Sequence, residues 1–206
     1  MPIPANIVEH WRSTKKTMKN RAFDLANWSF SSSDRILPDA NFWINVFGPA
    51  PVVGQRGRRV QDYSRAYGQI LGAGAEMMLD VLVMSEFVNT VARLEFNANY
   101  RSRYGPTGFK QFRNSPDFIL VARMIAGECR KIVQRSKRID HPFSGWDMND
   151  ILFSFERGGE DFNDQLITLM AKQKDCLLLT DDGDMTDGDI DVLTANPKLL
   201  QACPSN

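Results

Sequence analysis

Carboxylates follow apolar runs at three places in this chain of 206 residues. The acids, each with the run before it, are Asp39 after 36–38, Asp182 shortly after 177–179, and Glu86 after 77–84. Short apolar runs bounded by turn residues are typical of buried strands in a parallel sheet. In open α/β sheets, the chemistry gathers outside the carboxyl ends of the strands. We therefore expect these three acids to meet at one edge of a sheet.

A fourth acid, Asp164, comes at the start of the helical stretch that leads into Leu177. Two carboxylates about 5 Å apart repel by roughly 3 kcal/mol at an effective dielectric constant near 20, so four of them call for a cation. Ligand sets made only of oxygen, without His or Cys, favour Mg²⁺ or Mn²⁺ over zinc. The sequence thus predicts a site for Mg²⁺ or Mn²⁺ at this edge of the sheet.

Each acid also has a structural alternative. Asp39 could cap a helix, Glu86 could face a helix N-terminus, and Asp161 with Asp164 could form a cap and its partner three residues on. Asp182 with Gly183 could be a turn. These alternatives apply to single residues, whereas convergence of all four acids at one sheet edge favours a site.

Composition predicts a folded domain rather than a disordered or membrane-spanning chain. Charged residues make up 24% and hydrophobic residues 43%, as in ordinary globular domains. Three cysteines and two widely separated histidines give neither metal-ligand spacing nor a disulfide framework. No signal-peptide pattern and no apolar window of about 20 residues is present, so we expect a cytoplasmic protein without a membrane partner.

Charge is balanced overall but unevenly distributed. Ten Lys or Arg and two acids lie in 101–138, whereas twelve acids and three basic residues lie in 150–191. This pattern suits a polyanion held near an acidic metal site. The alternative is a solvated helix face. The residues we expect to contact phosphates are Arg130, Lys131, Arg135, Lys137 and Arg138.

Helical and strand patterns alternate along the chain, which predicts an α/β fold with a parallel sheet. Residues 5–20 have helical spacing and precede the first expected strand, so they predict an appended arm. The expected helices cover 41–47, 59–71, 85–97, 116–135, 149–156, 161–174 and 197–203. The expected strands end at 38 and 84, or cover 177–179 and 190–193.

Four short motifs resemble the PIN-domain ribonucleases, and particularly the VapC-type toxins of toxin-antitoxin pairs. They are the segments 37–41, 84–90, 164–171 and 178–185, in that order. The resemblance implies a PIN-like α/β fold with a central parallel sheet of four to five strands flanked by helices. The domains would then be an N-terminal helical arm over 1–33 and a nuclease domain over 34–206, with a basic helical insertion at about 100–138.

Carried over by position, the catalytic and metal-binding acids of the family fall on Asp39, Glu86, Asp164 and Asp182. Asp161 and Asp184 are further candidate metal ligands, and Thr180 is a neighbour. Spacing after Thr180 favours Asp182 over Asp181. The resemblance implies Mg²⁺- or Mn²⁺-dependent cleavage of RNA, frequently by a homodimer and frequently restrained by an antitoxin.

Two departures from the toxin pattern stand out: about thirty residues precede the first strand, and the segment between Glu86 and Asp164 is long. Both lie outside the four motifs, so they bear on the toxin role more than on the nuclease role. The alternative function is a catalytically inactive PIN-fold module that binds RNA or acts as a scaffold. A haloacid-dehalogenase-like phosphatase would need an Asp where Asn41 stands.

Overall fold

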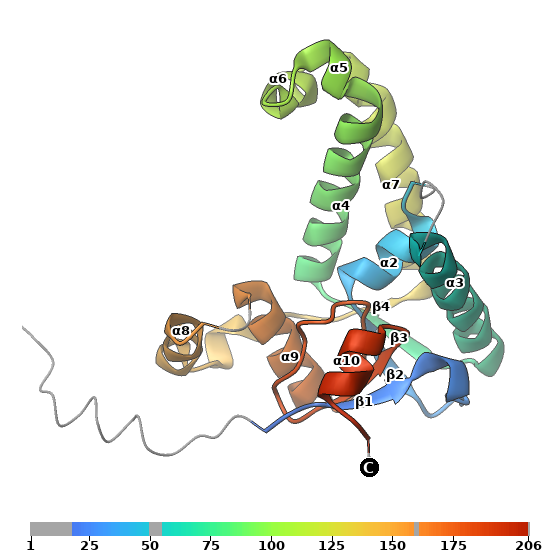
Figure 1. Ribbon diagram of the computed structural model, residues 1–206, viewed down its shortest axis with the longest axis vertical. Helices are drawn as coiled ribbons and strands as arrows, with labels where there is room; N and C mark the ends of the chain where they lie inside the picture. The colour runs from blue at the N-terminus through green and yellow to red at the C-terminus, as the bar shows by residue number, and fades with distance from the viewer. Residues whose placement is uncertain (1–17, 50–54, 159–160, 206) are drawn as a thin grey trace, which may run out of the picture.

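A computed structural model describes residues 18–49, 55–158 and 161–205 (Figure 1). Its sheet has six strands, all parallel, in the order β1-β6-β5-β2-β3-β4. The strands are β1 Arg21–Asp24, β2 Arg35–Pro38, β3 Glu76–Leu79, β4 Lys137–Arg138, β5 Leu177–Leu179 and β6 Asp191–Thr194. The predicted α/β class with a parallel sheet is confirmed, while the prediction of four to five strands is wrong.

Helices flank this sheet and connect its strands. The longer ones are α2 Ala40–Phe47, α3 Gln55–Ala73, α4 Val81–Glu95, α7 Asp117–Arg135, α8 Met148–Glu156 and α9 Phe162–Lys174. The shorter ones are η1 Leu25–Asn27, η2 Phe96–Tyr100, α5 Arg101–Tyr104, α6 Phe109–Arg113, η3 Phe143–Gly145 and α10 Pro197–Ala202. All seven predicted helices are present, with boundaries that differ by at most four residues.

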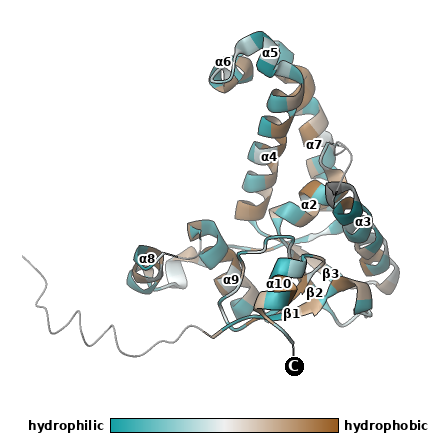
Figure 2. Ribbon diagram, viewed as in Figure 1, coloured by the Kyte–Doolittle hydropathy of each residue, from teal (hydrophilic) through white to brown (hydrophobic). Residues whose placement is uncertain are grey.

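Buried apolar residues explain the central strands. Ile36 and Leu37 of β2 and Leu178 and Leu179 of β5 are fully buried. Strands covered on both faces consist of nearly continuous apolar residues, as these do. Figure 2 shows hydrophobic residues along α2, which lies in the core, and mostly hydrophilic residues along α3.

The predicted strand over 77–84 is wrong in its second half. Strand β3 ends at Leu79, and Asp80 caps α4 by accepting a hydrogen bond of 2.7 Å from the backbone N–H of Leu82. Val83 and Phe87 are buried one helical turn apart, so the apolar run continues as a helix. Glu86 therefore lies in the second turn of α4 and not at the end of a strand.

The predicted N-terminal arm differs from the structure where the structure describes it. Residues 1–17 lie outside the described residues. Strand β1 follows directly and pairs in parallel with β6, with Ala22 opposite Val192 and Phe23 opposite Leu193. Residues 21–24 therefore belong to the sheet.

The basic segment forms most of an arm that rises from one end of the sheet (Figure 1). Helices α4 and α7 pack side by side as its shaft, and α5 and α6 form its tip. Aromatic rings of the tip contact one another around the fully buried Phe112. These rings stabilise the arm. Lys137 and Arg138, which follow the predicted helix over 116–135, form β4, which pairs with β3.

Candidate functional site

The carboxyl edge of the sheet brings acids together from four elements. Asp39 follows β2, Asp182 lies in the loop after β5, Glu86 is in α4, and Asp164 is in the first turn of α9. Strands β2 and β5 are neighbours in the sheet, so the first two acids come from adjacent strand ends. We call these four residues the acid cluster.

Electrostatic coupling within the acid cluster is visible in the pKa values of its members. Burial, followed by the carboxylates of Asp39, Asp161 and Asp182, raises the pKa of Glu86 to about 7. Burial and then Asp182 and Asp39 raise the pKa of Asp164 to about 7 as well. The charges that act on these two groups are carboxylates. The neighbouring carboxylates thus make it harder for Glu86 and Asp164 to ionise.

Asp39 is the most deeply buried acid of the cluster, at 3% exposure. Burial raises its pKa, while hydrogen bonds from Thr180 and from the backbone of Ala40 oppose the rise. The Thr180 hydroxyl donates to Asp39 Oδ2 at 2.9 Å, and the Ala40 N–H donates to Oδ1 at 2.6 Å. Asp39 therefore caps α2, as the structural alternative predicted, and also faces the other acids.

Asp161 likewise caps its helix, because its Oδ1 accepts from the backbone N–H of Asn163 at 2.9 Å. Its charge still contributes to the raised pKa of Glu86 and of Asp164. Asp161 therefore lies at the border of the acid cluster, with one oxygen committed to the helix.

The adjacent acids Asp181 and Asp182 have different surroundings. Asp181 is held by α3: Arg59 lies 3.0 Å from its Oδ2, and the Tyr63 hydroxyl lies 3.2 Å from its Oδ1. The carboxylate of Asp182 instead raises the pKa values of Glu86 and Asp164. Of these two acids, Asp182 is therefore the one that belongs to the acid cluster.

Asp184 is not brought into the acid cluster. It forms an ion pair with Lys198 of α10, and its side chain is 68% exposed. Sequence spacing cannot reveal this partner, because Lys198 lies 14 residues after Asp184 and the chain passes through β6 between them. The expected role of Asp184 as a metal ligand finds no geometric support.

The expected phosphate-binding residues are divided between α7 and β4, and two of them form ion pairs. Lys131 forms an ion pair with Glu128 at 2.8 Å, and Lys137 pairs with Glu76 at 2.9 Å. The charge of Arg135 lowers the pKa of Tyr67 of α3, against the larger rise caused by burial. Arg130 borders a groove on α7, and Arg138 belongs to β4. The structure does not gather these five residues at the site.

Asp80 is an acid of this edge that the sequence analysis missed. It is 1% exposed, follows β3 directly, and lies 2.9 Å from His141 Nδ1 through its Oδ2. The expected strand ran through it, so its role as a helix cap went unrecognised. The lone acid between the apolar runs 77–79 and 81–84 was the pattern that could have indicated the helix cap.

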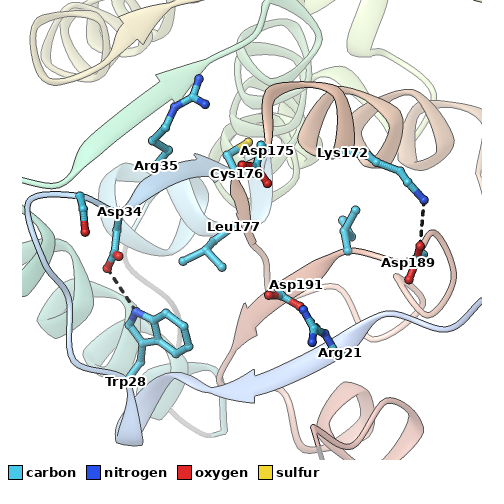
Figure 3. A pocket seen from close by; sticks show the side chains of 12 residues that line it. Arg21, Trp28, Asp34, Arg35, Lys172, Asp175, Cys176, Leu177, Asp189 and Asp191 are labelled. Atoms are coloured by element: carbon cyan, nitrogen blue, oxygen red, sulfur yellow. Dashed lines mark hydrogen bonds and ion pairs between the residues drawn. The ribbon is translucent and has the colours of Figure 1, made fainter.

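The opposite, amino edge of the sheet holds a polar hollow of about 480 Å³ (Figure 3). Four of its charged groups form two ion pairs: Arg21 lies 2.7 Å from Asp191, and Lys172 lies 3.1 Å from Asp189. The indole N–H of Trp28 points to Asp34 at 3.5 Å. Internal pairing makes this hollow a poor candidate for a charged ligand.

The acid cluster is chemically suited to a divalent cation, although its side chains do not form a closed cage. Within the described ranges, no three His, Cys, Asp or Glu side chains are grouped closely enough to enclose a metal ion. The donors are carboxylate oxygens, which prefer Mg²⁺ and Mn²⁺. A cation between them would lower the cost of ionising Glu86 and Asp164, so the residues fit such an ion.

Comparisons with known proteins add little to this geometry. No family model and no curated protein matches the chain. Among solved structures, it is similar to PAE2754 from Pyrobaculum aerophilum, with 14% sequence identity and a TM-score of 0.42. That match covers 84% of this chain and 97% of the other. None of the described helices has the length and apolar character needed to span a membrane.

Proposed function

We propose that this protein is a Mg²⁺- or Mn²⁺-dependent endoribonuclease that hydrolyses RNA phosphodiester bonds at Asp39, Glu86, Asp164 and Asp182. The observation that carries the proposal is the convergence of these carboxylates from four elements, with the pKa values of Glu86 and Asp164 both raised to about 7. Strongly perturbed pKa values are concentrated at functional sites.

A bound metal ion would supply an activated water and offset the charge that builds up on the scissile phosphate. The protein's own residues prepare the site for it. Thr180 fixes the side chain of Asp39 from one side, and the α2 N-terminus fixes it from the other. Arg59 and Tyr63 hold Asp181 against α3, which leaves Asp182 to face Glu86 and Asp164.

The alternative is a catalytically inactive PIN-fold protein that binds RNA or acts as a scaffold. Such a protein has no need for several half-buried carboxylates that repel one another, because each costs stability. The mutual repulsion in the acid cluster therefore favours the enzyme. RNA as the substrate, a VapC-type role, an antitoxin partner and a homodimer are proposed from the sequence resemblance.

Cleavage of a single-stranded RNA in Mg²⁺ or Mn²⁺ tests the proposal. We expect cleavage by the wild type, loss of cleavage in EDTA, and loss in Asp182→Asn. Asp184→Asn is the matched control, since it makes the same change two residues away at an exposed, Lys198-paired acid. Undiminished cleavage by Asp182→Asn would refute the site, and RNA binding without cleavage by the wild type would favour the inactive module.

A further inference from the structure

The polar face of α4 begins at the acid cluster and runs up the arm. At 3.6 residues per turn, Arg93, seven residues after Glu86, lies on nearly the same side of α4 as Glu86. Asn97 follows about one turn later, in η2, which continues α4 without a break. Asn89 lies beside this line. Asn89, Arg93 and Asn97 are all exposed. We call these three residues the polar face of α4.

Arg93 is held in place by the arm's tip. Its guanidinium carbon lies 4.6 Å from the centre of the Phe109 ring, a cation–π contact. Stacking on one side fixes the plane of the guanidinium and leaves its N–H groups free to donate at the edges. An arginine fixed in this way loses less side-chain freedom when it binds an oxyanion.

Acidic residues are absent from this side of the described α4 above Glu86. Glu95, nine residues after Glu86, lies on the opposite side of the helix, where its carboxylate accepts a hydrogen bond of 2.8 Å from Asn99. The polar face thus offers one cation and two amides, without a carboxylate that would repel a phosphate.

We propose that the polar face of α4 binds the backbone of a single-stranded RNA and leads it to the acid cluster. This inference rests on the proposed nuclease function. Arginine and asparagine side chains are common donors to phosphate and sugar oxygens. The neighbouring rings of the tip pack around Phe112 and not outward, so contacts along α4 go to the backbone and are tolerant of sequence.

A protein partner would suit the other helix of the arm better. On α7, the aliphatic side chains of Ile119 and Leu120 are 51% and 66% exposed, beside Arg123. Protein docking needs such apolar anchors. The polar face of α4 contains none, which favours a polyanionic strand. Helix α7 therefore supplies a control surface on the same arm.

Two substitutions on α4 test the proposal in the full chain. Binding of a single-stranded RNA is measured in Ca²⁺, which we expect to occupy the carboxylates without supporting cleavage, over a series of salt concentrations. Arg93→Gln should weaken binding about tenfold, since a hydrogen bond to a charged group contributes about 1.5 kcal/mol or more. It should also lower the slope of log affinity against log salt by about 0.7, the value for one phosphate contact on a single strand.

Asn97→Asp is the second variant, because it places a negative charge on the polar face and leaves the stacking of Arg93 on Phe109 intact. It should weaken RNA binding by several-fold. The matched controls are Asn99→Asp, which makes the same change on the opposite side of the helix, and Arg123→Gln on α7. Both controls should bind RNA as the wild type does.

Three results would overturn the inference. The wild type could fail to bind RNA, Arg93→Gln and Asn97→Asp could both bind RNA as tightly as the wild type does, or the control variants could lose as much affinity as these two variants. Unchanged RNA affinity together with an altered oligomeric state would mean that this face contacts a second copy of the chain instead. If the wild type cleaves RNA and the variants bind RNA as it does, the nuclease proposal holds and this inference is wrong. RNA binding that depends on Arg93, without cleavage, would support the inference and refute the nuclease.

Discussion

Both edges of the sheet carry charged side chains, but ion pairs dominate at the amino edge, whereas carboxylates face one another in the acid cluster at the carboxyl edge. At the amino edge, Arg21 pairs with Asp191 and Lys172 pairs with Asp189. At the carboxyl edge, Glu86 and Asp164 face other carboxylates, and their pKa values rise to about 7. The difference lies in compensation and not in the presence of charge. Repulsion that the fold leaves uncompensated costs stability, which makes the carboxyl edge the candidate site for a cation.

Cleavage activity should show the largest contrast between the edges. Asp164→Asn removes one carboxylate of the acid cluster and should abolish RNA cleavage in Mg²⁺ or Mn²⁺. Asp189→Asn makes the same change at the amino edge and should leave the rate unchanged, since Asn tolerates the left-handed backbone (φ 60°) of this residue. A quantitative gel assay measures both. Equal rates for the two variants would remove the distinction between the edges.

Asp161→Asn refines that contrast within the carboxyl edge. Asp161 caps α9, and Asn caps helices about as well as Asp. We expect Asp161→Asn to keep a measurable fraction of the cleavage rate. A loss as complete as that of Asp164→Asn would make Asp161 a direct ligand of the metal.

Metal binding should raise thermal stability through the carboxyl edge alone. At one hundred times its dissociation constant, a ligand of the folded state adds about 2.7 kcal/mol, or roughly 5–10 °C in Tm for a chain of this size. Differential scanning fluorimetry with Mn²⁺ and with EDTA measures the rise. We expect Glu86→Gln to lose most of it and Asp191→Asn to keep it. A full rise in Glu86→Gln would place the ion elsewhere.

Stability without metal should depend on pH in a direction set by the acid cluster. The pKa values of Glu86 and Asp164 are near 7 when folded and lower when unfolded, so the folded state binds more protons between the two values. Their destabilising effect is complete above pH 7 and disappears as the pH falls toward 4.5. Urea unfolding in EDTA should therefore show higher stability at pH 5.5 than at pH 8. Glu86→Gln should reduce this dependence, and a wild type that is more stable at pH 8 would contradict it.

Local sequence patterns were enough to predict some elements, but not the strands whose pairing partner is distant in the chain. The apolar run of β5 and the caps of α2 and α9 are local, and they were predictable. Strand β1 is specified by pairing with β6, about 170 residues away, and β4 by pairing with β3. A four-residue or two-residue strand at the edge of a sheet has too few residues to show a periodic pattern.

The convergence of the acid cluster was predictable from the sequence, whereas the orientation of single acids was not. Parallel strands end at one edge of the sheet, so acids that follow such strands are expected to meet there. Which neighbouring acid turns inward depends on groups from other elements. Arg59 and Tyr63 draw Asp181 toward α3, and Lys198 draws Asp184 outward. Those partners lie between 14 and 122 residues away in the chain, beyond the reach of a motif.

The smallest expected effect concerns the free energy of unfolding. Replacing a carboxylate by an amide should lower stability at the amino edge and should not lower it at the carboxyl edge. In EDTA at pH 8, Glu86→Gln removes a charge that faces other carboxylates, so the free energy of unfolding should stay equal or rise. Asp191→Asn breaks an ion pair with Arg21, whose side chain is 68% exposed, and should lower stability by about 0.2–1 kcal/mol. Added salt should shrink that loss, since exposed pairs are screened. Urea unfolding at two ionic strengths measures both changes. If Glu86→Gln were destabilised as much as Asp191→Asn, the carboxyl edge would be held together by its acids, and a structural role for the acid cluster would replace the catalytic one.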